Sequence, residues 1–141
     1  SAGATKPCGA CDGCRWFVAG SHPDLRRLEP EALARRIAAE DDSETPVAPA
    51  AKAAKPSQEI KVDQVRELDG FLSLRSHRGR RRIVLVHPAE AMNANAANAL
   101  LKALEEPQPG AHFILVSHRP ARLLPTIRSR CAAVPVGLPV G

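Results

Sequence analysis

Three cysteines near the start of the chain have the spacing of metal ligands. Cys8, Cys11 and Cys14 form two overlapping C-x-x-C pairs in the stretch "PCGACDGC". Thiolates at this spacing can converge on one zinc ion from a tight, glycine-containing turn. Free or redox-active thiols are the competing interpretation. Because two overlapping pairs are more specific than one, we favour a structural zinc site.

A structural zinc site needs a fourth ligand, because such sites are almost always tetrahedral and closed. Cys131 is far away in the sequence, and we interpret it as a small buried apolar residue. His22 is possible but follows the predicted helix. The donor that we favour is therefore a residue upstream of Ser1.

A second candidate site lies where a predicted strand ends. The apolar run Ile83–Val86 is typical of a buried parallel strand, and in nucleoside triphosphatases such a strand ends in acids that hold Mg²⁺ and orient water. Here His87 and Pro88 follow instead, and we interpret Glu90 as a solvent-exposed turn residue. The sequence also contains no G-x-x-x-x-G-K-[ST] phosphate loop. We therefore do not expect this stretch to hydrolyse nucleotide by itself.

The stretch "TIRSRC" places an arginine between two predicted elements. It ends a helical segment and leads into a predicted strand, an arrangement that can hold Arg130 at the surface. An arginine aimed at a neighbour's triphosphate stabilises charge that develops in the transition state. Arginine at such a junction is more often a structural ion-pair or carbonyl partner. From the residues alone both roles stay open.

The elements that must position these residues alternate along the chain. Bulky apolar residues recur at helical spacing or in short runs, with Asp63 a plausible N-cap. Strands that alternate with helices imply an α/β fold with a parallel sheet covered on both faces. The predicted helices are 14–19, 29–40, 61–76 (with Val62, Val65, Leu68 and Leu72 on one face), 95–105 (with Ala96, Ala97, Leu100, Leu101 and Leu104) and 119–130, broken at Pro125. The predicted strands are 25–30, 83–86, 112–117 and 131–136.

Composition divides the chain into a small module and a larger domain. Residues 1–24 hold the three clustered cysteines, and residues 25–141 hold the α/β pattern. The stretch 41–59 is rich in Ala, Pro, Ser and Lys, so we expect a flexible loop. No apolar run approaches the length of a membrane span, and no signal peptide is visible, so we expect a cytoplasmic protein.

The net charge of +5 favours an anionic partner such as nucleic acid, although arginine-rich surfaces are often only solvated. A basic cluster precedes the strand at residue 83, and its interpretation as a solvated turn is at least as good as a DNA contact. The cluster consists of Arg75, Arg78, Arg80, Arg81 and Arg82.

Taken together, three motifs resemble a known family. The runs "AMNANAANALLKALEEP", "FILVS" and "LLPTIRSRC" are similar to the AAA+ subunits of bacterial DNA polymerase III clamp loaders, and the cysteines resemble their zinc module. The resemblance implies a partial AAA+, P-loop NTPase-like sheet with flanking helices and an inserted N-terminal zinc module. It also implies that the chain is an internal piece whose first zinc ligand precedes Ser1.

The resemblance gives roles to several residues. The family's Ser-Arg-Cys motif falls on Ser129, Arg130 and Cys131, and its arginine acts in trans on ATP held by an adjacent motor subunit. His87 and Pro88 stand where motor subunits carry acids. The implied function is a non-hydrolysing stator that assists ATP-dependent loading of the sliding clamp onto primed DNA, with ATP bound only by neighbouring subunits.

The implied partners are the gamma/tau and delta clamp-loader subunits, primer-template DNA and, indirectly, the sliding clamp. A DNA phosphate could meet the helix N-terminus near Asn93 and Asn95. The alternatives are an ATP-hydrolysing gamma/tau motor subunit of the same loader, or a zinc-containing nucleic-acid-binding module whose binding falls steeply with salt.

Overall fold

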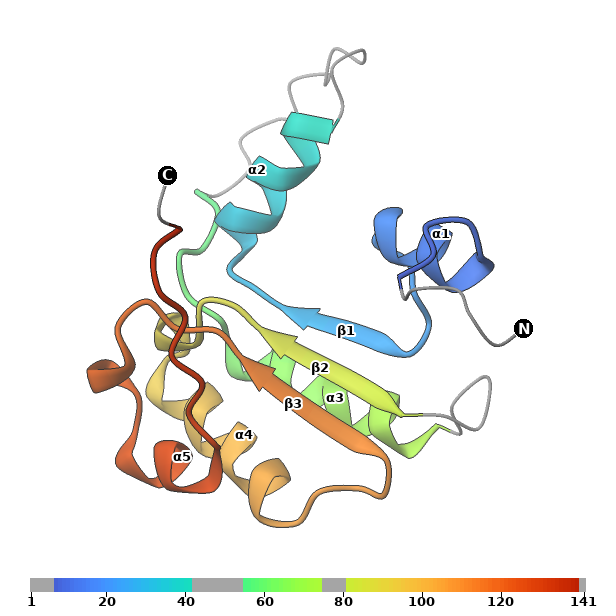
Figure 1. The fold of residues 1–141 in the computed structure, drawn as a ribbon. Coiled ribbons are helices and arrows are strands. Elements are labelled where there is room, and N and C mark those ends of the chain that lie inside the picture. Colours follow the sequence, from blue (N-terminus) through green and yellow to red (C-terminus); the bar gives the residue numbers. More distant parts are fainter. Residues whose placement is uncertain (1–6, 42–54, 75–80, 140–141) are drawn as a thin grey trace.

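The computed structural model describes residues 7–41, 55–74 and 81–139. Within these ranges short helices alternate with strands (Figure 1). The α-helices are α1 (Asp12–Val18), α2 (Glu31–Asp41), α3 (Val62–Ser73), α4 (Ala94–Glu105) and α5 (Pro125–Arg130). The strands are β1 (Leu25–Leu28), β2 (Arg82–Val86) and β3 (Ala111–Leu115), and two 3₁₀ turns are η1 (Ala89–Ala91) and η2 (Pro120–Arg122).

The three strands form one parallel sheet with β2 in the centre, in the order β1-β2-β3. Leu28 and Leu115 both pair with Val86, so the chain leaves all three strands at the same edge of the sheet. This confirms the predicted α/β class and its three predicted strands up to residue 115. The residues that follow β1, β2 and β3 are consequently brought together.

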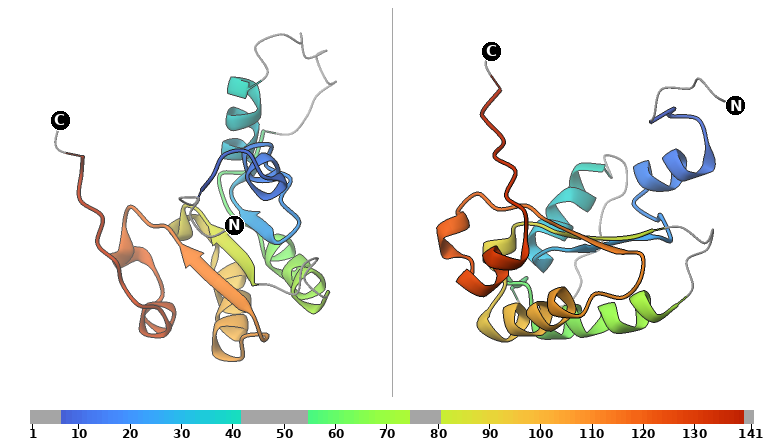
Figure 2. Two further views of the ribbon diagram at one scale, coloured as in Figure 1. Left: turned by 45° about the vertical axis from the view of Figure 1, so that its right-hand side comes forward. Right: turned by 60° about the horizontal axis from the view of Figure 1, so that its bottom comes forward.

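One face of the sheet carries the core, because α3 and α4 pack side by side against it (Figure 1, and Figure 2, right). Val84 and Val86 of β2 are fully buried there, as is Leu100 of α4. Fully burying an aliphatic side chain contributes about 1.5 to 3 kcal/mol. The predicted stripes of α3 and α4 form this layer. Their buried members are Val65, Leu68, Phe71, Ala96, Ala97 and Leu100, and Val62, Leu72, Leu101 and Leu104 are half-buried.

The opposite face differs from the prediction that the sheet is covered on both faces. Ile83 and Ile114 point to this face and remain 36% and 49% exposed. The helices α1 and α2 lie on this side near β1 and leave β2 and β3 open (Figure 2, right). Periodicity identified apolar strands correctly, but it cannot tell which neighbour covers each face. Among the described residues, no helix covers this part of the sheet.

The start of α3 also differs from the prediction. The N-cap is Lys61 rather than Asp63, which lies in the first helical turn. The Lys61 backbone amide donates to Gln64 Oε1 at 2.9 Å, and Gln64 Nε2 donates to the Glu29 carbonyl at 3.0 Å. Gln64 therefore closes the helix N-terminus and ties α3 to the end of β1.

The predicted strand 131–136 is wrong. The residues after α5 up to 139 are extended but hydrogen-bond to no strand that the structure describes, and Val134 and Val136 are 80% and 90% exposed. A strand is stabilised by a neighbouring strand, and this segment instead projects away from the sheet (Figure 2). The apolar residues of 131–136 predicted a strand, but no described strand pairs with this segment.

The predicted loop 41–59 is described only in part. Residues 42–54 lie outside the described ranges, whereas residues 55–59 are tied to the fold. The Ala32 amide donates to the Ser57 carbonyl at 3.0 Å. Ile60, which directly follows the segment 55–59, is fully buried. The end of this segment is therefore an ordered connection into α3 and not part of a flexible loop.

Candidate functional site

The three N-terminal cysteines come together in the turn that leads into α1. Their sulfur atoms all lie within 4.8 Å of one another, and Cys8 Sγ is 3.9 Å from Cys14 Sγ. Two sulfurs bound to one tetrahedral zinc, at about 2.3 Å each, lie about 3.8 Å apart. The arrangement of Cys8, Cys11 and Cys14 therefore fits three corners of a zinc tetrahedron with little adjustment.

The thiols of this cluster differ in acidity. Hydrogen bonds from the backbone of Ala10 and Cys11, and then from the Cys11 and Cys14 side chains, lower the pKa of Cys8 to about 7. The pKa of Cys14 is raised, chiefly through its hydrogen bond with the Cys11 side chain. A cysteine binds a metal through its thiolate form. Cys8 thus supplies a thiolate more readily than Cys14 does.

His22 lies near the cluster but has a different role. Its Nδ1 accepts a hydrogen bond from the Asp24 backbone amide at 3.1 Å, so the proton of the neutral ring is on Nε2. Metal-binding histidines show the reverse pattern, because the nitrogen away from the metal donates. No fourth residue joins the three cysteines within the described parts of the chain. Residues 1–6 lie outside these parts.

The cysteine module makes only light contacts with the sheet. No residue of α1 is buried, and Phe17 is 55% exposed. The Arg27 guanidinium of β1 lies 5.7 Å from the Phe17 ring centroid, whereas the Trp16 and His22 rings meet edge to face within the module itself. Such contacts contribute about 0.5 to 1 kcal/mol each at exposed sites. They orient the module but provide little stability.

The end of β2 carries no acid at the position where hydrolytic sites hold Mg²⁺. His87 follows the strand directly, and its Nε2 lies 3.3 Å from Nε2 of His118, which follows β3. Sequence reasoning missed His118, although its place three residues after β3 is the signal that could have revealed it. The arrangement supplies imidazole nitrogens and not the oxygen ligands that Mg²⁺ prefers.

Glu90 corrects a second expectation, because it is not a solvent-exposed turn residue. Its Oε1 accepts the His118 backbone amide at 3.1 Å, which joins the segments that follow β2 and β3. Burial would raise the pKa of Glu90, but hydrogen bonds from its own backbone, Ser117 and the His118 amide hold it below the usual value. The Glu90 carboxylate therefore stabilises the contact between the segments that follow β2 and β3.

Arg130 is the last residue of α5, and its side chain is 51% exposed. Helix α5 lies against α4, and its Ile127 is 1% exposed. Arg130 Nη2 lies 3.7 Å from Glu105 Oε1 at the end of α4, an ion-pair partner that sequence reasoning did not identify. This contact is long and exposed, so it leaves most of the guanidinium available.

The neighbours of Arg130 have local roles. The Ser129 hydroxyl donates to the Thr126 carbonyl at 2.8 Å and so stays within the last helical turn. Cys131 is half-buried and not fully buried as expected, and this burial raises the pKa of its thiol. Since no strand follows α5 up to residue 139, the Arg130 backbone is positioned by α5, and its side chain has the Glu105 ion pair.

The N-terminus of α4 is closed by its own cap. Asn93 Oδ1 accepts the Ala96 amide at 2.8 Å, and the Asn93 amide donates to the Ile60 carbonyl at 3.3 Å. Asn93 is therefore occupied in the fold. Asn95 is exposed in the first turn.

The predicted basic cluster is only partly visible. Arg75, Arg78 and Arg80 lie outside the described residues, and Arg81 is exposed. Arg82 is the first residue of β2 and only 7% exposed, with its guanidinium 5.2 Å from the Phe71 ring centroid. Arg82 was expected in a solvated loop, but it packs in the fold and is unavailable to DNA.

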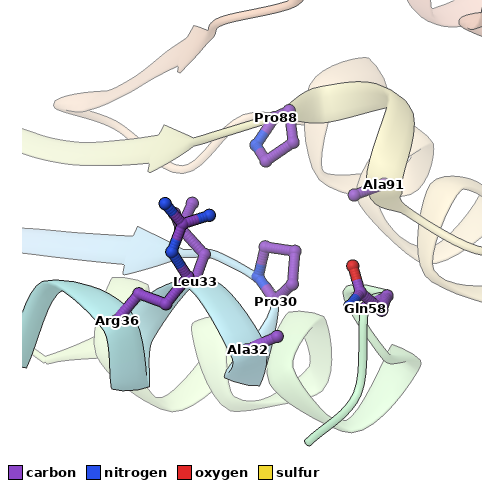
Figure 3. A pocket seen from close by; sticks show the side chains of 7 residues that line it. All are labelled: Pro30, Ala32, Leu33, Arg36, Gln58, Pro88 and Ala91. Atoms are coloured by element: carbon purple, nitrogen blue, oxygen red, sulfur yellow. The ribbon is translucent and has the colours of Figure 1, made fainter.

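A cavity of about 220 Å³ opens beside the ends of β1 and β2 (Figure 3). Pro30, Leu33 and Pro88 form apolar walls, and Arg36 of α2 is the only charged residue among those that line it. The residues that line this cavity include neither an acid nor a glycine-rich phosphate cradle.

No described helix is long and apolar enough to cross a membrane.

Comparison with known proteins identifies the family. The family model described as "DNA polymerase III, delta subunit" matches residues 1–137. The "DNA polymerase III subunit delta'" of Pseudomonas aeruginosa is 47% identical over 96% of this chain and 34% of its own length. That of Escherichia coli is 37% identical over 89% of this chain and 31% of its own length. The chain thus spans about a third of the length of these relatives.

A solved structure supports the fold. The "gamma subunit-related protein" of DNA polymerase III from Thermotoga maritima aligns with a TM-score of 0.55 and 33% identity, over 82% of this chain and 40% of that one. This confirms the predicted clamp-loader-like α/β architecture. With the family model covering nearly the whole chain, the chain belongs to the family of DNA polymerase III delta' subunits.

Proposed function

We propose that this protein is a non-hydrolysing stator of the DNA polymerase III clamp loader. In this role it assists ATP-dependent loading of the sliding clamp onto primed DNA and presents Arg130 to ATP bound by an adjacent motor subunit. Its partners are the gamma/tau and delta subunits and primer-template DNA, with the clamp contacted indirectly. The delta' relatives, and a tau subunit of Escherichia coli that is 31% identical over 89% of this chain, motivate this assembly.

The observation that carries the proposal is the chemistry at the end of β2. His87 and Pro88 follow β2 directly, at the place where a hydrolytic site needs carboxylates for Mg²⁺ and water. Glu90, the nearest acid, accepts a backbone hydrogen bond and is committed to the turn. A subunit built in this way retains the sheet for assembly and leaves hydrolysis to its neighbours.

The exposure of Arg130 supports its role in trans. A guanidinium that must reach another subunit's phosphates has to lie at the surface on a rigid element, and α5 lies against α4 with its Ile127 buried. The Glu105 contact can hold the side chain extended until it engages. Arginine suits this task because it keeps its charge and binds phosphate oxygens in a bidentate way.

The three cysteines are proposed to hold a structural zinc ion together with a fourth ligand upstream of Ser1. Bound zinc would supply four fixed bonds to a module that has no buried side chain in α1. Cys8, Cys11 and Cys14 would then replace the hydrophobic core that the module lacks. The ion takes no part in ATP hydrolysis.

The test is DNA-stimulated ATP hydrolysis by the loader reconstituted with Arg130→Ala. Loss of a trans-acting arginine lowers turnover by about 10³- to 10⁵-fold in well-studied nucleotide hydrolases, so a decrease of at least about tenfold is expected here. Assembly is measured in parallel by size-exclusion chromatography and should be unchanged.

Two variants separate this role from a structural one. Arg128→Ala removes an exposed arginine of the same helix and should leave turnover unchanged. Glu105→Gln breaks the ion pair but retains Arg130, so it should also hydrolyse ATP normally. Equal losses in Arg130→Ala and Glu105→Gln would reduce Arg130 to a structural residue and refute its role in trans.

A further inference from the structure

The imidazole rings of His87 and His118 contact each other, and the stator role does not use this contact. They come from segments that follow β2 and β3, and their rings meet at an angle of 71° with centroids 5.5 Å apart. His118 is exposed and His87 is half-buried, so solvent reaches the pair. The Nε2 atoms, the outermost nitrogens of the rings, face each other at 3.3 Å.

This separation matches that of two ligands on one metal ion. Zinc binds imidazole nitrogen at about 2.0 to 2.1 Å, so two nitrogens at tetrahedral angles lie about 3.3 to 3.4 Å apart. The same distance is also compatible with a hydrogen bond between neutral rings. Whether the two rings bind a metal ion or hydrogen-bond to each other therefore depends on whether a suitable ion is present.

The backbone holds the two histidines in place before any ion binds. The His87 amide donates to the Leu28 carbonyl at 3.0 Å, and the Val116 amide donates to the Val86 carbonyl at 2.9 Å. The Ala89 amide then donates to the Val116 carbonyl at 2.8 Å, which joins the two segments beyond the strands. A pair preorganised in this way loses little conformational entropy on binding.

The charge beside the pair favours a cation. Glu90 Oε1 accepts the His118 backbone amide at 3.1 Å, and, despite burial, hydrogen bonds from its own backbone, Ser117 and the His118 amide hold the pKa of Glu90 below its usual value. The carboxylate thus places a negative charge next to His118. It also fixes the segment that carries His118.

We propose that His87 and His118 form a binding site for a divalent transition-metal ion that prefers imidazole, such as Zn²⁺, Co²⁺, Ni²⁺ or Cu²⁺. Two protein ligands leave the remaining positions open to water or to an anionic ligand. Mg²⁺ is excluded because it requires oxygen ligands in near-octahedral geometry. The site is separate from the cysteine cluster, whose ligands are thiolates at the other end of the described chain.

The experiment is equilibrium dialysis of the full-length protein against Zn²⁺ at neutral pH. The Cys8→Ser/Cys11→Ser/Cys14→Ser background removes the thiolate site, so one remaining bound equivalent is expected. Changing a residue behind a metal ligand typically costs 10- to 100-fold in affinity, so loss of a ligand in His118→Ala or His87→Ala should cost at least about tenfold. A large excess of Mg²⁺ should not displace the ion.

His112→Ala is the matched control, because His112 is an exposed histidine on β3 whose Nδ1 lies 3.1 Å from the Gly110 carbonyl oxygen, away from the His87–His118 pair. The affinity of the His112→Ala variant for Zn²⁺ should equal that of the triple-serine protein in which it is made. Imidazole ¹⁵N spectra of the wild-type protein, loaded first at the cysteines, give a readout that needs no variant. Added Zn²⁺ should shift the Nε2 resonances of His87 and His118 and no other.

The proposal is overturned if no Zn²⁺ equivalent remains in the cysteine-free background. It is equally overturned if His118→Ala binds as tightly as the control, or if the Nε2 resonances of His87 and His118 do not move. In those cases the pair is only a hydrogen bond between neutral rings. The result is independent of the ATPase test of Arg130.

Discussion

The cysteine module and the covered face of the sheet are stabilised in opposite ways. In α1 no residue is buried, and Val18 is 82% exposed. On the sheet face covered by α3 and α4, Val84, Val86 and Leu100 are fully buried. A segment without a core needs a substitute, and small modules commonly use a metal. We infer that zinc binding stabilises the module, while burial stabilises the sheet, and each can be disturbed separately.

The largest effect is expected from removing the metal. Cys11→Ser, or chelation of the wild-type protein, should unfold residues 7–20 locally while the sheet stays folded, because structural zinc contributes about 10 to 16 kcal/mol in zinc-finger peptides. Hydrogen exchange can measure this. The Arg15 amide, which bonds to the Cys11 carbonyl, should lose protection, whereas the Ile83 amide in β2 should keep it.

Cys131→Ser is the control for this experiment, since Cys131 lies outside the cluster. It should leave the exchange of residues 7–20 unchanged. Loss of protection in β2 after chelation would contradict the separation of the two regions.

The next largest effect is expected in the core. Leu100→Ala should lower the free energy of unfolding by about 2 to 5 kcal/mol, because it removes a fully buried side chain and leaves a cavity. Urea denaturation monitored by circular dichroism measures it. Val18→Ala in exposed α1 should change the value by less than about 0.5 kcal/mol. An equal decrease in the free energy of unfolding for Leu100→Ala and Val18→Ala would mean that the module shares the core of the sheet.

A smaller effect is expected at the N-terminus of α4. Asn93→Ala removes the cap on the Ala96 amide and should cost about 1 kcal/mol. Asn95→Ala, in the same exposed turn, has no cap to lose and should be neutral or slightly stabilising. Thermal unfolding of the two variants distinguishes them, and an equal decrease would argue against the capping role.

The smallest effect is expected at the Arg130 ion pair. Glu105→Gln should change the free energy of unfolding by at most about 1 kcal/mol, because the pair is 3.7 Å long and both side chains are about half exposed. Denaturation at low and high salt measures it. A larger loss that salt abolishes would show that Arg130 is needed for folding.

Much of the covered layer could be predicted from the sequence because its signals are local. The apolar run before His87 gave β2, and the spacing of Ala96 and Leu100 gave the buried face of α4. The C-x-x-C spacing likewise predicted that the cysteines converge, which the sulfur distances confirm. Each of these patterns is complete within one short segment.

The remaining features depend on partners that no single segment reveals. The open face beside Ile114, and residues 131–136, which pair with no described strand, both depend on which neighbours are present. The pairing of His87 with His118, and of Arg130 with Glu105, joins residues that are distant in the sequence. Without a contact map, periodicity could suggest their elements but not their contacts.

The most direct test of the stator account is single-turnover ATP hydrolysis by the assembled loader carrying Arg130→Ala. Single-turnover conditions isolate the chemical step from ATP binding and product release. The account predicts that the rate of this step falls at least about tenfold, while ATP affinity and assembly match those of the wild type and of Glu105→Gln. An unchanged rate would contradict it and would leave this subunit without a role in hydrolysis.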